Sequence, residues 1–161
     1  MKNFKRFLAL VMVLCMCMGL TACARSATEE ETTTRLVENA VKNFDTLEAA
    51  AADSGTSLTL PSNVDAQPTG YATQGAILEV TYGDGDLVIR KAPGNEDISG
   101  DENTYAATKQ LDVNGKYVTV KGAAEGAWNL ILWLGEDATY SVYCKEAIND
   151  EAVASLIAMI K

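Results

Sequence analysis

Four oxygen-bearing side chains alternate along an acidic stretch in the middle of the chain. Asp97, Ser99, Asp101 and Asn103 occupy every second position, and Gly100 allows a sharp bend among them. This spacing is typical of the first half of a calcium-binding loop, in which alternate oxygens converge on the ion. Thr108 stands at the twelfth position, where such a loop carries a bidentate glutamate. We therefore expect a solvated turn here, with a weak calcium site as the alternative.

The other carboxylates and the cysteines offer little for catalysis. Asp84 and Asp86 flank Gly85 in a turn sequence, whereas a glycosidase pair needs a cleft and roughly 5–9 Å between its carboxyl groups. The chain contains no histidine, which excludes Ser/His and Cys/His hydrolases and histidine-ligated zinc sites. Cys144 is therefore expected to be a buried strand residue. We expect no enzymatic activity and no cofactor, with a carboxylate-based glycan hydrolase as a distant alternative.

Aromatic residues follow the predicted strands of the second half of the chain. Trp128 and Trp133 are five positions apart, so strand alternation places them on opposite faces. One indole would face the helices, and the other would be free to stack on a sugar or a peptide. Arg90 and Lys91 are adjacent, so they also point to opposite faces, and one of them is expected to pair with the acidic loop. The weak binding candidates are thus Trp128, Trp133 and Arg90. Core packing is the simpler interpretation of the aromatic residues. The other aromatic residues of the predicted sheet are Tyr82, Tyr105, Tyr117, Tyr140 and Tyr143.

A strand-rich segment positions these side chains. From Gly70 onward the hydrophobic period is two, which predicts strands over 76–82, 87–91, 105–113, 117–121, 127–134 and 139–145. Asn114-Gly115 is the strongest hairpin signal among the turns between them. Residues 127–134 barely alternate, which predicts a central strand with both faces largely covered.

Helices are predicted on both sides of this strand-rich segment. Residues 45–48 form a capping box with Asp45 as the N-cap, Gly55 is placed to end that helix, and a short strand over 57–60 follows. Asn149 caps a C-terminal helix whose apolar stripe comprises Val153, Leu156, Ile157 and Ile160. These elements predict an α+β fold, with an antiparallel sheet of about six strands and both helices packed on one face.

The chain begins with a targeting pattern. Lys2, Lys5 and Arg6 precede an uncharged, mostly apolar run over 7–18, which is shorter than the roughly 20 residues of a membrane-spanning helix and suits a signal peptide. Residues 20–23 read Leu-Thr-Ala-Cys, and this N-terminus resembles that of bacterial lipoproteins with their lipobox. The resemblance implies a signal peptide over 1–22, cleavage before Cys23, acylation of the Cys23 thiol, and a location on the extracytoplasmic face of the cell membrane.

The chain after the signal divides into a tether and a domain. Residues 24–34 contain no large apolar side chain and are expected to be a flexible spacer. Helical spacing of apolar residues over 36–44 predicts a short lead-in helix. We therefore assign 23–43 to the lipidated cysteine, the tether and the lead-in helix, and 44–161 to a single α+β domain. The formal net charge of −9 argues against nucleic acid or an anionic membrane surface as the main partner.

Several segments of this domain are similar to one known family. They are residues 45–50 and 58–61, residues 88–101 with Asn103 and Tyr105, and the late segments 128–133 and 140–142. In these the domain resembles the domain of unknown function 4367 family of Gram-positive lipoproteins and other membrane-tethered extracytoplasmic proteins. The resemblance implies an α+β fold and an extracytoplasmic binding or sensory role, and it brings no catalytic residues.

Together these patterns predict a lipid-anchored, non-enzymatic module that binds a ligand, a cell-wall component or a partner protein through one face of its sheet. The alternative is a carrier or chaperone of lipophilic molecules, in which sheet and helices enclose an apolar cavity like that of a half-barrel. The shape of the uncovered face separates the two, because a flat polar face suits a partner and a concave apolar face suits a lipid.

Overall fold

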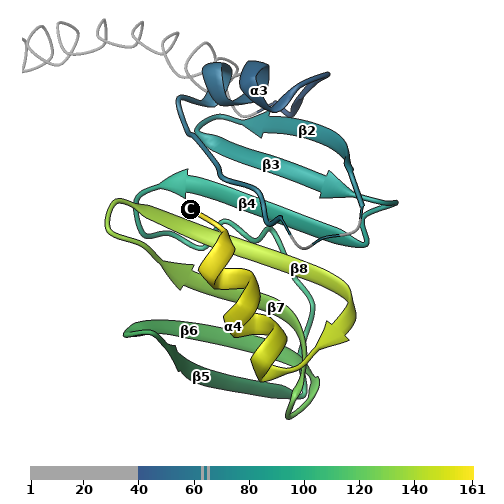
Figure 1. The fold of residues 1–161 in the computed structure, drawn as a ribbon, viewed down its shortest axis with the longest axis vertical. Helices are drawn as coiled ribbons and strands as arrows, with labels where there is room; N and C mark the ends of the chain where they lie inside the picture. Colours follow the sequence, from purple (N-terminus) through teal and green to yellow (C-terminus); the bar gives the residue numbers. More distant parts are fainter. Residues whose placement is uncertain (1–39, 63, 65) are drawn as a thin grey trace, which may run out of the picture. The chain divides into compact units, whose positions relative to one another are not determined.

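The computed structural model describes residues 40–62, 64 and 66–161, and the predicted signal peptide, Cys23 and tether lie outside them. The described residues form an antiparallel eight-stranded sheet in the order β1-β2-β3-β4-β8-β7-β6-β5 (Figure 1). They also form two helices, α3 (Leu47–Ser54) and α4 (Asp150–Met159). The predicted α+β class is therefore confirmed, with eight strands in place of about six. Neither of the described helices is long and apolar enough to cross a membrane.

The six strands predicted from Ala76 onward are all present. Asn114 and Gly115 form the predicted hairpin turn with positive φ angles of 54° and 79°, as a type I′ turn requires. The predicted central strand β7 lies between β6 and β8, inside the sheet. The bounds of the six strands are β3 (Ile77–Tyr82), β4 (Leu87–Pro93), β5 (Ala107–Val113), β6 (Lys116–Ala124), β7 (Ala127–Leu134) and β8 (Ala138–Ile148).

Two further strands extend the sheet beside α3. β1 (Lys42–Phe44) pairs with β2 (Pro68–Gln74), and β2 pairs with β3. The sequence of β2 contains Pro, Gly, Gln and two Thr, so its hydrophobic alternation is too weak to be seen. The predicted lead-in helix is wrong over 40–44, where the chain has no helix and residues 42–44 pair with β2. Residues 36–39 of that prediction lie outside the described residues.

Helix α3 begins one residue later than its capping box predicts. The N-cap is Thr46 in place of Asp45, and its hydroxyl accepts a hydrogen bond from the amide of Ala49 at 3.2 Å. Gly55 ends the helix with a φ of 69°, in the left-handed conformation that the sequence predicts.

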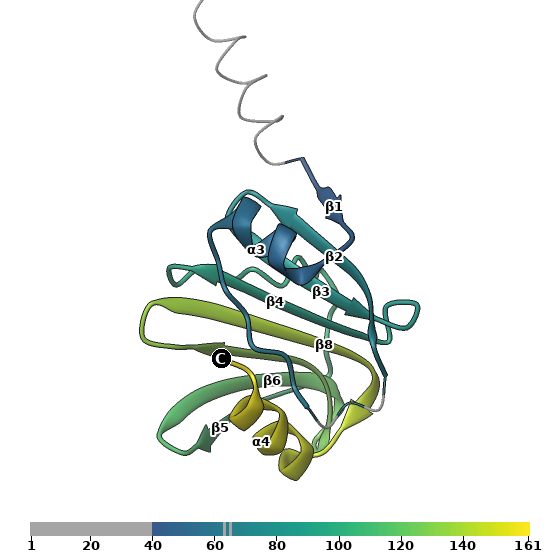
Figure 2. The same ribbon diagram turned by 45° about the horizontal axis from the view of Figure 1, so that its top comes forward.

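The strand predicted over 57–60 is not formed. The segment instead crosses the sheet on the side of the helices, where Leu58 is buried in the core (Figure 2). The Ser57 carbonyl accepts from Lys91 Nζ at 2.7 Å, and the Thr59 amide donates to the Lys161 carbonyl at 2.8 Å. Its backbone groups therefore bind a side chain and the chain end, and not a neighbouring strand.

One hydrophobic cluster joins the sheet to both helices. The register places Val80, Ile89, Val142, Ile131 and Val120 side by side across β3, β4, β8, β7 and β6, and each is fully buried. Ala50 of α3 and Ile157 of α4 belong to the same cluster. Both helices lie on this side of the sheet (Figure 2). We call this side the helix-covered face, and the side to which the alternate residues point is the open face.

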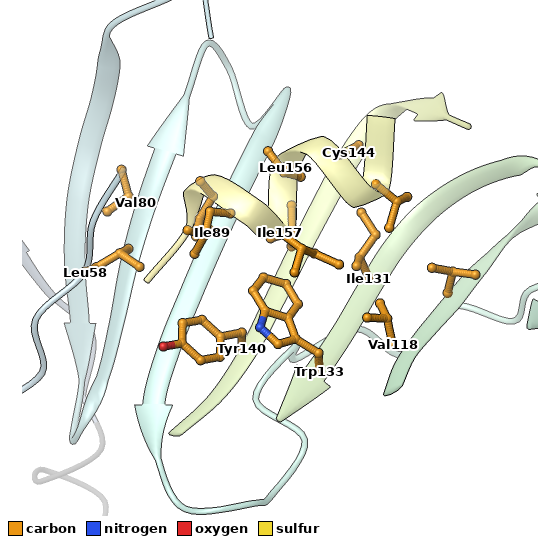
Figure 3. Close-up of a cluster of buried hydrophobic side chains, with 14 of the residues drawn as sticks. Leu58, Val80, Ile89, Val118, Ile131, Trp133, Tyr140, Cys144, Leu156 and Ile157 are labelled. Atoms are coloured by element: carbon orange, nitrogen blue, oxygen red, sulfur yellow. The ribbon is translucent and has the colours of Figure 1, made fainter. Parts of the chain in front are cut away.

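Both tryptophans lie on the helix-covered face, so the predicted opposite placement is wrong. On β6, Gly122 pairs with Trp128 and Lys121 with Leu130, so β7 has one residue more than β6 at this point, which marks a bulge at Asn129. The bulge adds one residue to the alternation, and Trp128 therefore joins Trp133 in the core cluster. Trp133 stacks on Tyr140 with 4.8 Å between the ring centroids (Figure 3).

Candidate functional site

The acidic segment crosses the open face of the sheet. Residues 94–106 connect β4 to β5, which are separated by β8, β7 and β6. Gly100 lies against Arg90, since a Cβ at Gly100 would be 3.2 Å from an Arg90 Nη. Arg90 adjoins the fully buried Ile89 and so points to the open face. The face that the sequence leaves without a covering element is therefore crossed by this loop.

The four oxygen-bearing residues shape the loop itself. Asp97 accepts from the Ser99 amide at 2.8 Å, and Ser99 Oγ accepts from the Asp101 amide at 3.3 Å. The Asp101 carboxylate accepts from the Asn103 amide at 3.2 Å and from the Tyr105 hydroxyl at 2.6 Å. These are the short-range bonds that Asp and Ser make in turns. Within the described ranges no group of three or more metal-ligating side chains is close enough to hold an ion. The calcium alternative stays a prediction.

Two titratable groups of the loop have shifted pKa values. Burial raises the pKa of Asp97, but hydrogen bonds from Ser99 and the charge of Lys121 outweigh it, so that this pKa lies below its usual value. Burial, followed by the hydrogen bond to Asp101, raises the pKa of Tyr105 to about 12. Near neutral pH Asp97 is thus an ionised acceptor and Tyr105 a neutral phenol. Neither is poised to exchange a proton with a substrate.

A groove lies between this loop and the β5–β6 hairpin, and we call it the loop groove. It has a volume of about 470 Å³. Val118 pairs with Trp133, so Tyr117 and Leu134, the next residues outward, lie opposite each other on neighbouring strands. Tyr117 is 72% exposed and Leu134 is 53% exposed, which makes them two of the three large apolar residues exposed in the described part of the chain. The groove is lined by Asn95, Glu96, Asp97, Gln110, Gly115, Lys116, Tyr117, Thr119, Leu132, Trp133, Leu134 and Thr139.

The loop groove combines an apolar platform with hydrogen-bonding groups. The Tyr117 ring and the Leu134 side chain supply apolar surface, while Glu96, Gln110 and Thr119 supply donors and acceptors. Such a combination can stack on a sugar ring or take an apolar peptide side chain while satisfying the polar groups around it.

Of the predicted binding candidates Trp128, Trp133 and Arg90, only Trp133 lines the loop groove. Trp128 and Trp133 are 0% and 3% exposed, so neither indole presents a free ring face to a ligand. Arg90 and Lys91 point to opposite faces, as predicted. Arg90 forms its ion pair with Glu79 at 2.6 Å. The expected partner was a residue of the acidic loop. The reason is register, because Arg90 and Glu79 are directly opposite on β4 and β3.

The carboxylates of the β3–β4 turn have a structural role. The Asp86 carboxylate pairs with Lys145 Nζ at 2.9 Å. The hydrogen bond from Lys145 and then its charge lower the pKa of Asp86, which is therefore ionised near neutral pH. This agrees with the turn role that the sequence predicts for Asp84 and Asp86.

Sequence reasoning missed the two residues that mark the loop groove. The sequence pattern places Tyr117 among the other aromatic residues of the sheet and does not single out Leu134. Alternation does place Tyr117 on the face opposite Val118, which is a usable signal. The sequence does not show that this face meets a loop from a distant strand.

Comparisons of the chain with models of known families, with curated proteins and with solved structures find no match. The resemblance to the domain of unknown function 4367 family stays a prediction.

Proposed function

We propose that this protein is a non-enzymatic binding module, anchored by a lipid on Cys23 at the extracytoplasmic face of the cell membrane, that holds a cell-wall or protein ligand in the loop groove. The observation that carries this proposal is the exposed pair Tyr117 and Leu134, which forms an apolar platform inside a groove with a polar border. Large apolar side chains exposed in such a setting are typical of interaction sites. The lipobox pattern at 20–23 supports the anchor.

The chemistry of the described residues supports binding over catalysis. The chain has no histidine, Asp97 is held ionised by its own loop, and Asp86 is paired with Lys145. A catalytic carboxylate pair would need one group kept protonated near neutral pH, and these two carboxylates have pKa values shifted in the opposite direction.

The alternative, a carrier in which sheet and helices enclose one central apolar cavity, has less support. Side chains fill the centre of that space, where Val80, Ile131 and Val142 are fully buried. The open face is divided by the 94–106 loop and does not form one continuous apolar surface.

Capture from solubilised membranes tests the proposal. The intact lipoprotein would be isolated as the wild type, as the double variant Tyr117→Ser/Leu134→Ser, and as Val41→Ser. Val41 is the matched control, because it is 61% exposed and lies outside the loop groove. Co-purified proteins and co-sedimentation with purified cell-wall sacculi are measured in parallel.

We expect the wild type and Val41→Ser to retain the same partner or to sediment with sacculi, and the double variant to lose it. Equal retention by all three proteins would show that the loop groove is not the site. Hydrolysis of sacculi by the wild type would show that the protein is an enzyme and contradict the proposal.

A further inference from the structure

A second and larger groove lies beside α4, and we call it the α4 groove. It has a volume of about 820 Å³, within the range of small-molecule sites. Its walls come from α4, from the end of β8, from the β3–β4 turn, and from Val64 and Ala66 ahead of β2. Cys144 and Leu156 contribute to it and also to the core cluster, so it lies on the helix-covered face, away from the loop groove (Figure 3).

The floor of the α4 groove is apolar. Tyr82, Cys144 and Leu156 are buried in the core and present their outer surfaces to it, and Leu87 and Ile148 flank them half-buried. Burial raises the pKa of the Cys144 thiol to about 11, so the thiol is neutral and adds no charge to this floor. An alkyl or ring system placed here would remove apolar surface from water on both partners.

The rim of the groove carries an excess of negative charge. Lys145 is paired with Asp86 at 2.9 Å, so its charge is compensated within the rim. Glu146 lines the same rim. The hydrogen bond to Asp86 and, to a smaller extent, the charge of Asp84 raise the pKa of Lys145, so Asp84 also adds negative charge near this rim. An anionic head group would therefore be repelled at this rim, while a cationic one would be attracted.

We propose that the α4 groove binds an amphiphile with an apolar body and a positively charged head group. The apolar body covers the floor formed by Tyr82, Leu87 and Leu156, and the head group lies at the rim beside Glu146. This site is separate from the loop groove, and the proposal does not depend on the function assigned to that groove.

Two exposed alanines of α4 allow a matched test. Ala152 lines the groove, whereas Ala158 is exposed on the same helix outside it. Ala152→Trp would fill the groove without altering the core, and Ala158→Trp places the same side chain elsewhere on α4. Ser155→Trp, at a second exposed position of the groove wall, replaces Ala152→Trp if that variant melts well below the control.

The experiment uses the full chain in phosphatidylcholine vesicles. Each protein is photolysed with a diazirine-bearing alkyltrimethylammonium probe or with the alkyl carboxylate of equal chain length, and the labelled peptides are mapped by mass spectrometry. The N-terminal segment is the same in all proteins, so its labelling is a constant background.

We expect the ammonium probe to label peptides of β8 and α4 in the wild type and in Ala158→Trp, and Ala152→Trp to lose most of that labelling. The carboxylate probe should label these peptides more weakly. Undiminished labelling of Ala152→Trp would overturn the proposal of a site in this groove. Equal or stronger labelling by the carboxylate would overturn the assignment of a cationic ligand.

Discussion

Asp150 connects three elements at one side of the sheet. Its carboxylate accepts from Nε1 of Trp128 on β7 and from Nζ of Lys109 on β5 at 3.2 Å, and the residue itself begins α4. Trp128 is fully buried, so its indole N–H has no access to water. The hydrogen bond from Trp128, followed by the contact with Lys109, lowers the pKa of Asp150 against the effect of burial. A single carboxylate thus fixes the start of α4 against the sheet.

Asp150→Ala should lower the free energy of unfolding by about 1–3 kcal/mol, because a buried indole donor loses its acceptor. Glu151→Ala is the matched control, since Glu151 is an exposed acidic residue in the same first turn of α4. It should cost less than about 1 kcal/mol, the value of a charge near a helix N-terminus. Urea unfolding of the two variants measures the difference, and equal losses would show that the Trp128 contact contributes nothing.

Ionisation of Cys144 should lower the free energy of unfolding at alkaline pH. Burial raises its pKa to about 11 from the 9.0 of an unperturbed thiol. Because the folded state holds the proton more tightly, its stabilisation is complete below about pH 9 and is lost as the pH rises towards 11. The loss should reach roughly 3 kcal/mol across that range, at 1.36 kcal/mol for each pKa unit.

Cys144→Ala removes this contribution while leaving the other alkaline groups in place. The free energy of unfolding of the variant should therefore fall less steeply between pH 9 and pH 11 than that of the wild type. Denaturant unfolding at several pH values gives both slopes. Parallel slopes would mean that the thiol is not buried as described.

Irregularities within the strands decide which side chains face the core. The bulge at Asn129 turns Trp128 towards α4, and the β6–β7 register also shifts on either side of Gly122. A Cβ at Gly122 would lie 1.9 Å from the Ala127 carbonyl oxygen, so the close approach of the two strands requires glycine there. The position of Trp128 in the core therefore depends on local strand geometry that simple alternation does not contain.

Gly122→Ala should destabilise the protein by about 1–3 kcal/mol, the usual cost of forcing an extra methyl group into a packed site. Gly70→Ala provides the control, because the nearest atom to its added Cβ is 3.8 Å away in another strand. That change should leave the free energy of unfolding equal or slightly higher, since alanine restricts the unfolded chain. Thermal or urea unfolding of both variants measures the two changes in stability. A Gly122→Ala variant as stable as the wild type would show that β6 and β7 separate easily.

Calcium should not raise the melting temperature, because the oxygens of Asp97, Ser99 and Asp101 are engaged by the loop's own donors. A site saturated at 100 times its dissociation constant would add about 2.7 kcal/mol and several degrees. Melting in chelator and then in millimolar calcium measures this. A clear rise that Asp97→Asn with Asp101→Asn abolishes would instead establish a calcium site.

At the scale of the whole molecule, the two faces of the sheet are covered in different ways. Helices and the 57–60 segment fill one face with a continuous apolar core, while the 94–106 loop crosses the other and leaves the loop groove beside it. A rigid core on one side can support an adaptable loop on the other, an arrangement common to binding proteins. A tether of the kind predicted over 24–34 would let such a domain reach ligands at a distance from the membrane.

Cys23→Ser should release the protein from the membrane or leave its precursor uncleaved, because in the proposed lipoprotein the acylated Cys23 thiol is the anchor and the signal is cut before this residue. Detergent phase partitioning and the apparent mass of the protein measure the two outcomes. A variant that still enters the detergent phase at the mature size would contradict lipid anchoring.

Residues close together in the chain are enough to predict the α+β class, the six strands from Ala76 onward, the type I′ turn at Asn114-Gly115 and the Asn149 cap of α4. The other features depend on contacts between distant segments. The weak sequences of β1 and β2 become strands only by pairing, and a bulge moves Trp128 to the helix-covered face. Tyr117 and Leu134 form the loop groove only because a loop from β4 passes over the intervening strands. Hydrophobic periodicity records which residues face a core, but contacts between segments far apart in the chain leave no local pattern to read.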